Sequence, residues 1–552
     1  MLRRRLVLAL LIGSLGCNTE QPSPGSPTDA PAPADSPKPE ARPIRAPSQP
    51  DLAALPELAS APVDSPAIAQ TGEVMATLQL PSGCSIDDLA PVIEGFAPGA
   101  TAKARLQMPI TLGELAGMKL DGASLTAPIS IVVVDPNANP EPAALVVEFD
   151  DLERLRASAS EAGRELRVRD RLALIGSPAV VAAVESFAFT NLAKAPDHTE
   201  LVLYPAALMR SLGPMIEQGL ATMPTTGPTG AEASIATMAK SMVGMTRAFG
   251  EQSGRVVISV TASKRSADIY MRVYPIAGTT LAKFVAAQVP ADHALLAKLP
   301  LSPDTSAVIS GRFEAGAARA SMLELFSGMM REFYGSTLSI EAWDAMLADW
   351  LDALDGRVAM SVKLGMLTAP GVQRMAILMG SSDPERLRSS WRAMIEAMSA
   401  SPVPFMQAMG MKMSFDSTPN ALEHEGVVID RFETHTDISA MTPQMQTAMK
   451  AAGSDHQVIH FAAFDQVGAM GSSAEDIEGL IDAVRSESEP APLGPDLAHA
   501  LAASTARGES LFYWFDFAGL MPTPNVGLPF RGVVMGMGKQ GDALSLCLSL
   551  TK

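Results

Sequence analysis

Two parts of this chain repeat the same order of motifs, and this repetition constrains the fold more than any other feature. The motif DLERLR begins at Asp151 and its counterpart DPERLR begins at Asp383. Each follows an apolar run, and each starts with an Asp that is suited to cap a helix. Two earlier pairs of motifs recur at nearly the same spacing, about 233 residues, which predicts a tandem duplication.

The order of motifs continues beyond this point, but the second copy becomes longer. A strand, a Gly-Ser turn and a helix are expected around Gly176 in the first copy and around Gly471 in the second. The spacing has grown there, which places an insertion near 400–455 in the second copy. We therefore expect two homologous halves, 71–290 and 291–552.

Strand patterns alternate with helical patterns in both halves, and each half closes with two strands. This alternation predicts an α+β fold in which each half is an antiparallel or mixed sheet covered by helices. An α/β fold with a purely parallel sheet is the alternative. In the stretch 339–356, apolar side chains recur at helical spacing, which predicts a helix that packs on the core.

The sequence GMGKQG at 536–541 matches a glycine pattern that binds dinucleotides when it joins a strand to a helix. Its counterpart in the first half, VTASKR, has no glycine and leads into the alternating strand IYMRVY. The pattern therefore predicts the turn region of a hairpin, in which glycine adopts backbone angles that other residues avoid. We expect no nucleotide ligand and no cofactor.

The composition excludes a second class of partner. The formal net charge is −18, with 60 acidic against 42 basic residues, whereas binding to nucleic acid needs clustered Lys and Arg. No nucleic acid is expected as a partner. The chain also has neither a GxSxG nucleophile elbow nor a GxxxxGK[ST] phosphate loop.

The chain begins with MLRRRLVLALLIGSLGC, in which arginines precede a short apolar run, and this predicts a signal peptide over 1–16. The end of the run resembles the lipobox of bacterial lipoproteins, in which the cysteine is lipidated and becomes the mature N-terminus. The chain departs from that pattern at Ser14 and Leu15. The resemblance implies a lipid such as palmitate on Cys17, and Asn18 implies the outer rather than the inner membrane. An ordinary cleaved signal peptide is the alternative.

The segment 17–70 is rich in Pro, Ala and Ser and cannot bury enough apolar surface to fold. It predicts a disordered tether that holds the body away from a membrane. The body itself loosely resembles uncharacterised secreted bacterial proteins that repeat modules of strands and helices. An exported, lipid-anchored protein of the cell envelope is therefore expected.

Methionine occurs 32 times in the chain and recurs at close spacing in stretches specific to one half or the other. Core packing is the simplest explanation. The alternative is a deformable apolar surface that binds lipid, peptide or another envelope protein. The candidate residues of that surface are Met238, Met242, Met245, Met406, Met409, Met441 and Met445.

Four of the seven histidines fall close together in the second half, among acidic residues that include Glu433. They are His424, His435, His456 and His460. Imidazole and carboxylate groups are suitable zinc ligands, so these histidines are candidates for a metal site. No recognised metal-binding spacing is present, however, and polar strand ends explain the residues more simply.

Cys84 and Cys547 can form a disulfide in an oxidising compartment or remain free thiols. For the whole chain we expect a non-enzymatic binding or scaffolding role, with an apolar or peptide ligand held near 289–303 or under the Met-rich stretches. An envelope hydrolase is the first alternative, and convergent Asp, Glu or His side chains in a cleft would favour it. A purely structural surface protein is the second.

Overall fold

The structure is a computed structural model in which the body of the chain runs from Pro56 to Lys552 and a separate unit covers Met1–Leu55. The described residues all lie in the body. They are 74–81, 100–193, 198–221, 247–262, 266–301, 305–314, 339–363, 374–400, 412–439, 455–486, 493–516 and 532–551, with isolated residues between some of these ranges. The predicted signal peptide, Cys17 and the predicted tether lie outside them.

The described strands form one 18-stranded sheet. The strands are β1 (Val74–Leu80), β2 (Ile129–Val134), β3 (Ala143–Glu148), β4 (Glu165–Arg169), β5 (Leu172–Gly176), β6 (Thr199–Leu203), β7 (Ser253–Ala262), β8 (Ser266–Pro275), β9 (Ala307–Arg312), β10 (Leu354–Lys363), β11 (Arg374–Ser381), β12 (Lys412–His424), β13 (Val427–Asp437), β14 (His456–Phe464), β15 (Val467–Gly471), β16 (Glu509–Asp516), β17 (Gly532–Gln540) and β18 (Ala543–Thr551). The helices are α3 (Ala100–Ala116), α4 (Leu152–Glu161), α5 (Pro178–Asn191), α6 (Pro205–Ala221), α8 (Thr280–Ala286), η3 (Leu296–Lys298), α10 (Ile340–Ala353), α11 (Pro384–Ala400), α14 (Ala474–Arg485) and α15 (Pro495–Ala506).

Each strand of the sheet runs antiparallel to its neighbours, and the pairs connect all 18 strands from one end to the other. The order is β4, β5, β3, β2, β1, β6, β7, β8, β18, β17, β16, β9, β10, β11, β15, β14, β13 and β12. The prediction of an α+β fold with an antiparallel sheet is therefore confirmed for the described residues. The alternative, a parallel α/β sheet, is wrong.

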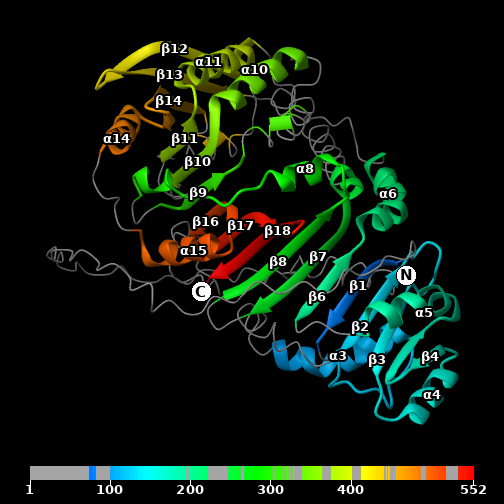
Figure 1. The fold of residues 1–552 in the computed structure, drawn as a ribbon. Coiled ribbons are helices and arrows are strands. Elements are labelled where there is room, and N and C mark those ends of the chain that lie inside the picture. The colour runs from blue at the N-terminus through cyan, green and yellow to red at the C-terminus, as the bar shows by residue number, and fades with distance from the viewer. Residues whose placement is uncertain are drawn as a thin grey trace, which may run out of the picture. The chain divides into compact units, whose positions relative to one another are not determined.

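Helices cover both faces of the sheet near its first end (Figure 1). On one face, Leu155 of α4 packs with Leu145 of β3, and on the other, Val184 of α5 packs with Val146. Successive residues of a strand point to opposite faces, so both faces of β3 are apolar. This double burial explains why β2 and β3 are almost entirely apolar, with the sequences ISIVVV and AALVVE.

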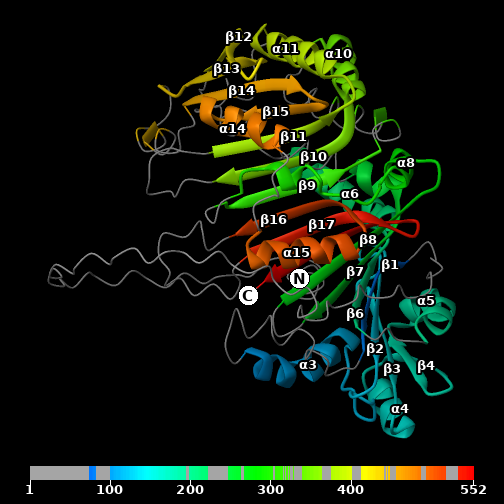
Figure 2. The same cartoon turned by 60° about the vertical axis from the view of Figure 1, so that its left-hand side comes forward.

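The same arrangement holds near the other end of the sheet (Figure 2). Leu351 of α10 and Leu387 of α11 share a buried cluster with Phe461 of β14. The next residue of the strand, Ala462, lies in a different cluster with Ile477 of α14. The prediction that 339–356 contains a core-packing helix is confirmed, since α10 buries its apolar side chains there.

The repeated Asp residues cap helices in the same way. The side chain of Asp151 accepts a hydrogen bond from the backbone N–H of Arg154 at the start of α4. Asp383 accepts one from the N–H of Arg386 at the start of α11. Each cap satisfies an N–H group that has no partner within its helix, so the capping prediction is confirmed.

Strands β8 and β18 are the eighth and ninth of the 18 strands in the pairing order, close to its middle. They pair in antiparallel register, with Tyr270 opposite Cys547. Both side chains are buried, and the thiol of Cys547 is free. Burial raises the pKa of both groups, so neither is ionised near neutral pH. Cys84 lies outside the described residues.

The GMGKQG sequence forms the end of β17 and the turn into β18, as the hairpin prediction requires. Gln540 pairs with Ala543, and Gly541 between them has a positive φ of 58°. The other two glycines, Gly536 and Gly538, stand where there is no room for a side chain. A Cβ on Gly536 would collide with the carboxylate of Glu509, and a Cβ on Gly538 would lie 2.9 Å from the Cα of Glu509.

We predict that Gly538→Ala lowers the free energy of unfolding by about 1 to 3 kcal/mol, because the added methyl group meets backbone that cannot move aside easily. Gly479→Ala is the matched control. Gly479 is exposed within α14 and nothing lies near its Cβ position, so alanine there should stabilise the chain by up to about 1 kcal/mol. Urea unfolding of both variants checks the prediction, and a Gly538→Ala variant as stable as the control would contradict it.

Candidate functional site

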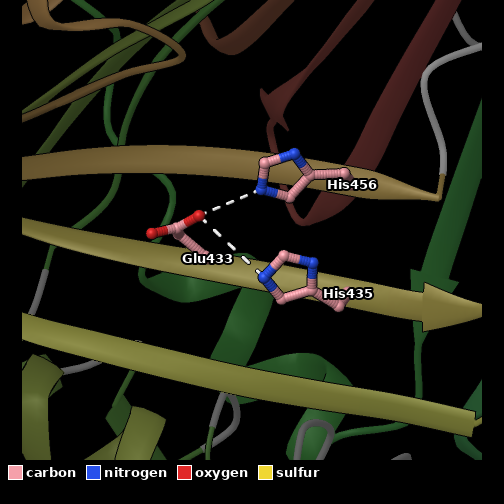
Figure 3. A group of neighbouring side chains, drawn as sticks. All are labelled: Glu433, His435 and His456. Carbon is pink, nitrogen blue, oxygen red and sulfur yellow. Dashed lines mark hydrogen bonds and ion pairs between the residues drawn. The ribbon is translucent and has the colours of Figure 1, made fainter.

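The outer strands β13 and β14 bring two of the predicted histidines together. His435 on β13 lies directly opposite His456 on β14, and Glu433 lies on the same face of β13 two residues before His435. Figure 3 shows the three side chains gathered on that face. We call Glu433, His435 and His456 the outer-strand triad.

The ligating atoms of the triad converge. His456 Nε2 lies 3.0 Å from Glu433 Oε2, and His435 Nε2 lies 3.9 Å from the same oxygen. The two imidazole rings are stacked, with centroids 4.5 Å apart and planes 6° from parallel. Both rings are about half exposed, with 46% and 47% of their side-chain surface accessible.

Charged neighbours surround the triad. The hydrogen bond with His456 lowers the pKa of Glu433, so this carboxylate is ionised at neutral pH. Arg431 Nη2 lies 3.1 Å from Glu433 Oε1, the oxygen that faces away from the histidines. Asp416 on β12 adds a second carboxylate, with its Oδ2 3.6 Å from His435 Nε2.

A cavity of about 680 Å³ opens beside the triad, and both histidines line it. Its remaining lining residues are mostly polar and carry both signs of charge. They are Lys412, Met413, Ser414, Thr436, Asp437, Ile438, Ser439, Gln446, Lys450 and Asp455. Hydrogen bonds from Ser439 lower the pKa of Asp437, so the cavity holds at least one ionised carboxylate near neutral pH.

The other two predicted histidines lie apart from the triad. His424 Nε2 is 2.7 Å from Asp482 Oδ1, and this hydrogen bond raises the pKa of His424. His460 lies opposite Arg431 and is buried, which lowers its pKa. The four candidate histidines therefore do not form one site.

A smaller cavity of about 430 Å³ lies near β1 and α5. Its lining is mostly small apolar side chains, with Asp135 as the acidic member. The Ser211 hydroxyl donates a hydrogen bond of 2.6 Å to Asp135, which lowers the pKa of that carboxyl. Asp135 is thereby held as part of a local network with Asn137, whose backbone N–H donates to it at 2.8 Å.

The segment 289–303, where a cleft between the halves was expected, is packed where the structure describes it. Leu295, Leu296 and Leu299 are buried in the cluster that includes α14. Lys298 Nζ donates a hydrogen bond of 2.7 Å to the backbone oxygen of Ser486. The described part of the segment therefore packs three leucines into the core, while Asp292, Ala294, Ala297 and Pro300 are exposed.

The candidate apolar surface lies outside the described residues. This holds for each of its seven members, Met238, Met242, Met245, Met406, Met409, Met441 and Met445. Residues of the same region that are described, such as Gln446 and Lys450, line the large cavity.

A buried ion-pair network holds the β12–β13 hairpin, which carries part of the triad, on helix α11. Asp430 of β13 is fully buried, and Arg388 and Arg392 of α11 each donate two hydrogen bonds to it, at 2.6 to 3.0 Å. The backbone N–H of Asn420 on β12 donates a further bond of 2.9 Å. Burial alone would raise the pKa of Asp430, but the arginine bonds outweigh it and keep that pKa well below its usual range.

Glu433 and His435 were named from the sequence, but it was not predicted that they share a face. Their spacing of two in the strand-like stretch RFETHTD was the available signal. The network around Asp430 had no such signal, because its members come from a helix and a hairpin that only the fold brings together.

We predict that Asp430→Asn lowers the free energy of unfolding by about 3 to 5 kcal/mol at pH 7, since it leaves two arginines around a neutral amide. The pKa of Asp430 is lower in the folded chain than in the unfolded chain, where it is about 3.9. Its contribution is therefore complete at neutral pH and declines as the pH falls below about 4.

Denaturant unfolding of wild type and Asp430→Asn between pH 7 and pH 3 measures this. Asp416→Asn is the control on the same hairpin, because Asp416 is 72% exposed and its loss should change stability by less than about 0.5 kcal/mol. A difference between wild type and Asp430→Asn that stays constant across the pH range would contradict the prediction.

Comparisons of the chain with protein-family models, curated proteins and solved structures find no match. Within the described residues, every helix is either too short or too polar to cross a membrane. The function proposed below therefore rests on the chain's own residues.

Proposed function

We propose that this chain is a non-enzymatic binding protein of the cell envelope, anchored by a lipid on Cys17 and joined to its body by the segment 17–70. The short apolar run after three arginines and the cysteine that ends it support the export and the anchor. The residue after that cysteine, Asn18, favours the outer membrane over the inner one. The Pro-rich composition of the tether supports a body held at a distance from the membrane.

The cavity beside the outer-strand triad is the observation that carries the binding role. Its volume of about 680 Å³ is within the range of sites that hold small molecules or short peptide segments. It is lined by side chains of β12, β13 and β14 and of the residues between β13 and β14. Much of this lining belongs to the insertion near 400–455. The first half has no segment that corresponds to this insertion.

A peptide is the ligand class that this lining suits best. Lys412 and Lys450 offer cationic donors, Asp437 and Asp455 offer acceptors, and Met413 and Ile438 provide apolar contacts. A purely apolar ligand would leave those polar groups without partners, at a cost in free energy for each group that it covered. A peptide carries donors, acceptors and apolar side chains together.

A hydrolase is the second candidate, and the outer-strand triad is the observation that favours it. Two imidazoles and a carboxylate converge next to a cavity, which is a common arrangement for acid–base or metal-assisted chemistry. The exposure of the triad favours binding instead. Catalytic groups act best in a site that excludes water, and His435 and His456 are both about half exposed. A purely structural surface protein is the third candidate and has no specific observation in its favour.

Matched strand registers support a tandem duplication of the body, with a boundary near residue 290. Gly176 at the end of β5 lies opposite Ala144, and Gly471 at the end of β15 lies opposite Ala376. These two glycines begin the Gly-Ser turns that occupy corresponding positions in the two copies of the repeated motifs. The insertion near 400–455 contains the β12–β13 hairpin, which extends the second half beyond β14.

The closing hairpins of the two halves also match. Val256 lies opposite Val273 in the first hairpin, and Val533 lies opposite Leu550 in the second. The interval from Val256 to Val533 equals the interval from Val273 to Leu550. The two hairpins therefore have the same register.

This interval also separates Tyr270 from Cys547, which lie opposite each other where β8 meets β18. Each of these strands thus pairs with its own counterpart, so the join between the halves has local two-fold symmetry. Self-complementary contacts of this kind are typical of two-fold interfaces. The symmetry supports a fused pair of related units.

Selection of peptides from a displayed random library on the immobilised full-length chain tests the binding role. We predict that enriched peptides bind the wild type and lose about tenfold or more of their affinity for the Lys412→Glu/Lys450→Glu variant, because the charge of the cavity changes. Lys539→Glu is the control, since Lys539 is an exposed residue of β17 that does not line the cavity.

A library that yields no binder, or binders that hold equally well to the cavity variant, would contradict the proposal. Cleavage of the bound peptides, or release of product from ester, peptide or glycoside substrates by the wild type, would instead favour the hydrolase.

A further inference from the structure

We propose that the outer-strand triad is a binding site for a divalent transition-metal ion of the zinc type. Three strands supply potential ligands: Glu433 and His435 come from β13, His456 from β14 and Asp416 from β12. This inference does not depend on the peptide proposed above, because an ion can bind whether or not the cavity takes a peptide.

The distances fit such an ion. A zinc ion lies about 2.0 to 2.1 Å from imidazole nitrogens and carboxylate oxygens, so two of its ligands in a tetrahedron are about 3.3 Å apart. The separations from Glu433 Oε2 to His456 Nε2 and His435 Nε2 are 3.0 and 3.9 Å, one below and one above that value. All three potential ligand atoms lie within 4.8 Å of one another.

The chemistry of the three groups points to the class of ion. Two imidazoles and one carboxylate suit zinc, copper, nickel and iron, whereas calcium and magnesium prefer oxygen ligands alone. Small rotations of the stacked rings are needed to aim both Nε2 lone pairs at one point, and the half-exposed rings have room for them.

Two neighbours set the strength of the site. Arg431 is the cation closest to Glu433, and it binds Oε1, which leaves Oε2 for the ion. Asp416 Oδ2 lies 3.6 Å from His435 Nε2, but Asp416 is outside the group of converging atoms and would have to move to act as a fourth ligand. The fourth position is otherwise open to water or to a group in the cavity that the two histidines line.

The second group with possible ligand atoms, His424 with Glu425 and Asp482, is a poorer candidate and serves as a control. It offers one imidazole and two carboxylates, whereas the triad offers two imidazoles and one carboxylate.

Calorimetric titration of Zn²⁺ into the full-length chain, stripped of metal with a chelator, tests the proposal. We expect one saturable site in the wild type, its loss in His435→Ala/His456→Ala, and binding about tenfold or more weaker in Glu433→Gln. His424→Ala should bind as the wild type does. Titration with Co²⁺ should give a visible ligand-field absorption in the wild type that is missing from the double variant.

The substituted side chains are exposed, so the metal-free double variant should unfold at the same temperature as the metal-free wild type. Zn²⁺ should raise the unfolding temperature of the wild type and leave that of the double variant unchanged. The proposal is overturned if the wild type shows no saturable site, if the double variant titrates like the wild type, or if His424→Ala loses the site.

Discussion

The pairing of β8 with β18 is the interaction on which the rest of the sheet depends. Without it, the backbone N–H and C=O groups on one side of each strand would need other partners in a buried setting. With it, two consecutive sets of strands, β1 to β8 and β9 to β18, become one sheet. Tyr270 and Cys547, which lie opposite each other in this pairing, are both buried.

The carboxylate of Glu509 on β16 is buried near these central strands and makes two close contacts. Arg507 Nε donates a hydrogen bond of 2.6 Å to Glu509 Oε1, which provides that buried carboxylate with a cationic partner. The same carboxylate occupies the space that a side chain on Gly536 would need. The glycines of GMGKQG therefore serve close packing next to the central strands, and their spacing resembles a nucleotide-binding loop for an unrelated reason.

The candidate site lies far from these central strands, near the end of the sheet, on β13 and β14. Among the described strands, β12 is paired on one side only, with β13, whereas β13 pairs with both β12 and β14. A hairpin at the end of a sheet can acquire new residues without disturbing the core. The β12–β13 hairpin pairs with the rest of the described sheet only through β14. The ion pairs of Arg388 and Arg392 with Asp430 also attach it to helix α11.

Much of the fold could be predicted from sequence because it follows from local patterns and from their repetition. The capping role of Asp151 and Asp383 and the hairpin at GMGKQG needed only neighbouring residues. The order of strands was beyond reach, since a strand pattern states which side chains share a face and not which strand lies beside it. The antiparallel direction was left open for the same reason.

The candidate site shows the same division. A cluster of histidines and acids was visible in the sequence, but its geometry was not, because the pairing of His435 with His456 depends on the register of β13 and β14. Arg388 illustrates a further limit. Its counterpart in the first repeated motif, Arg156, makes an exposed ion pair with Glu153 of its own helix, so the motif did not indicate the buried partner Asp430.

Amide hydrogen exchange in β8 and β18, followed by mass spectrometry of the full-length chain, is the most direct test of the central claim that these strands join the two sets into one sheet. Strands paired on both sides should be protected along their whole length, at a level similar to β7 and β17. Rapid exchange of alternate amides in both β8 and β18, with β7 and β17 still protected, would show that both are edge strands and would contradict the account.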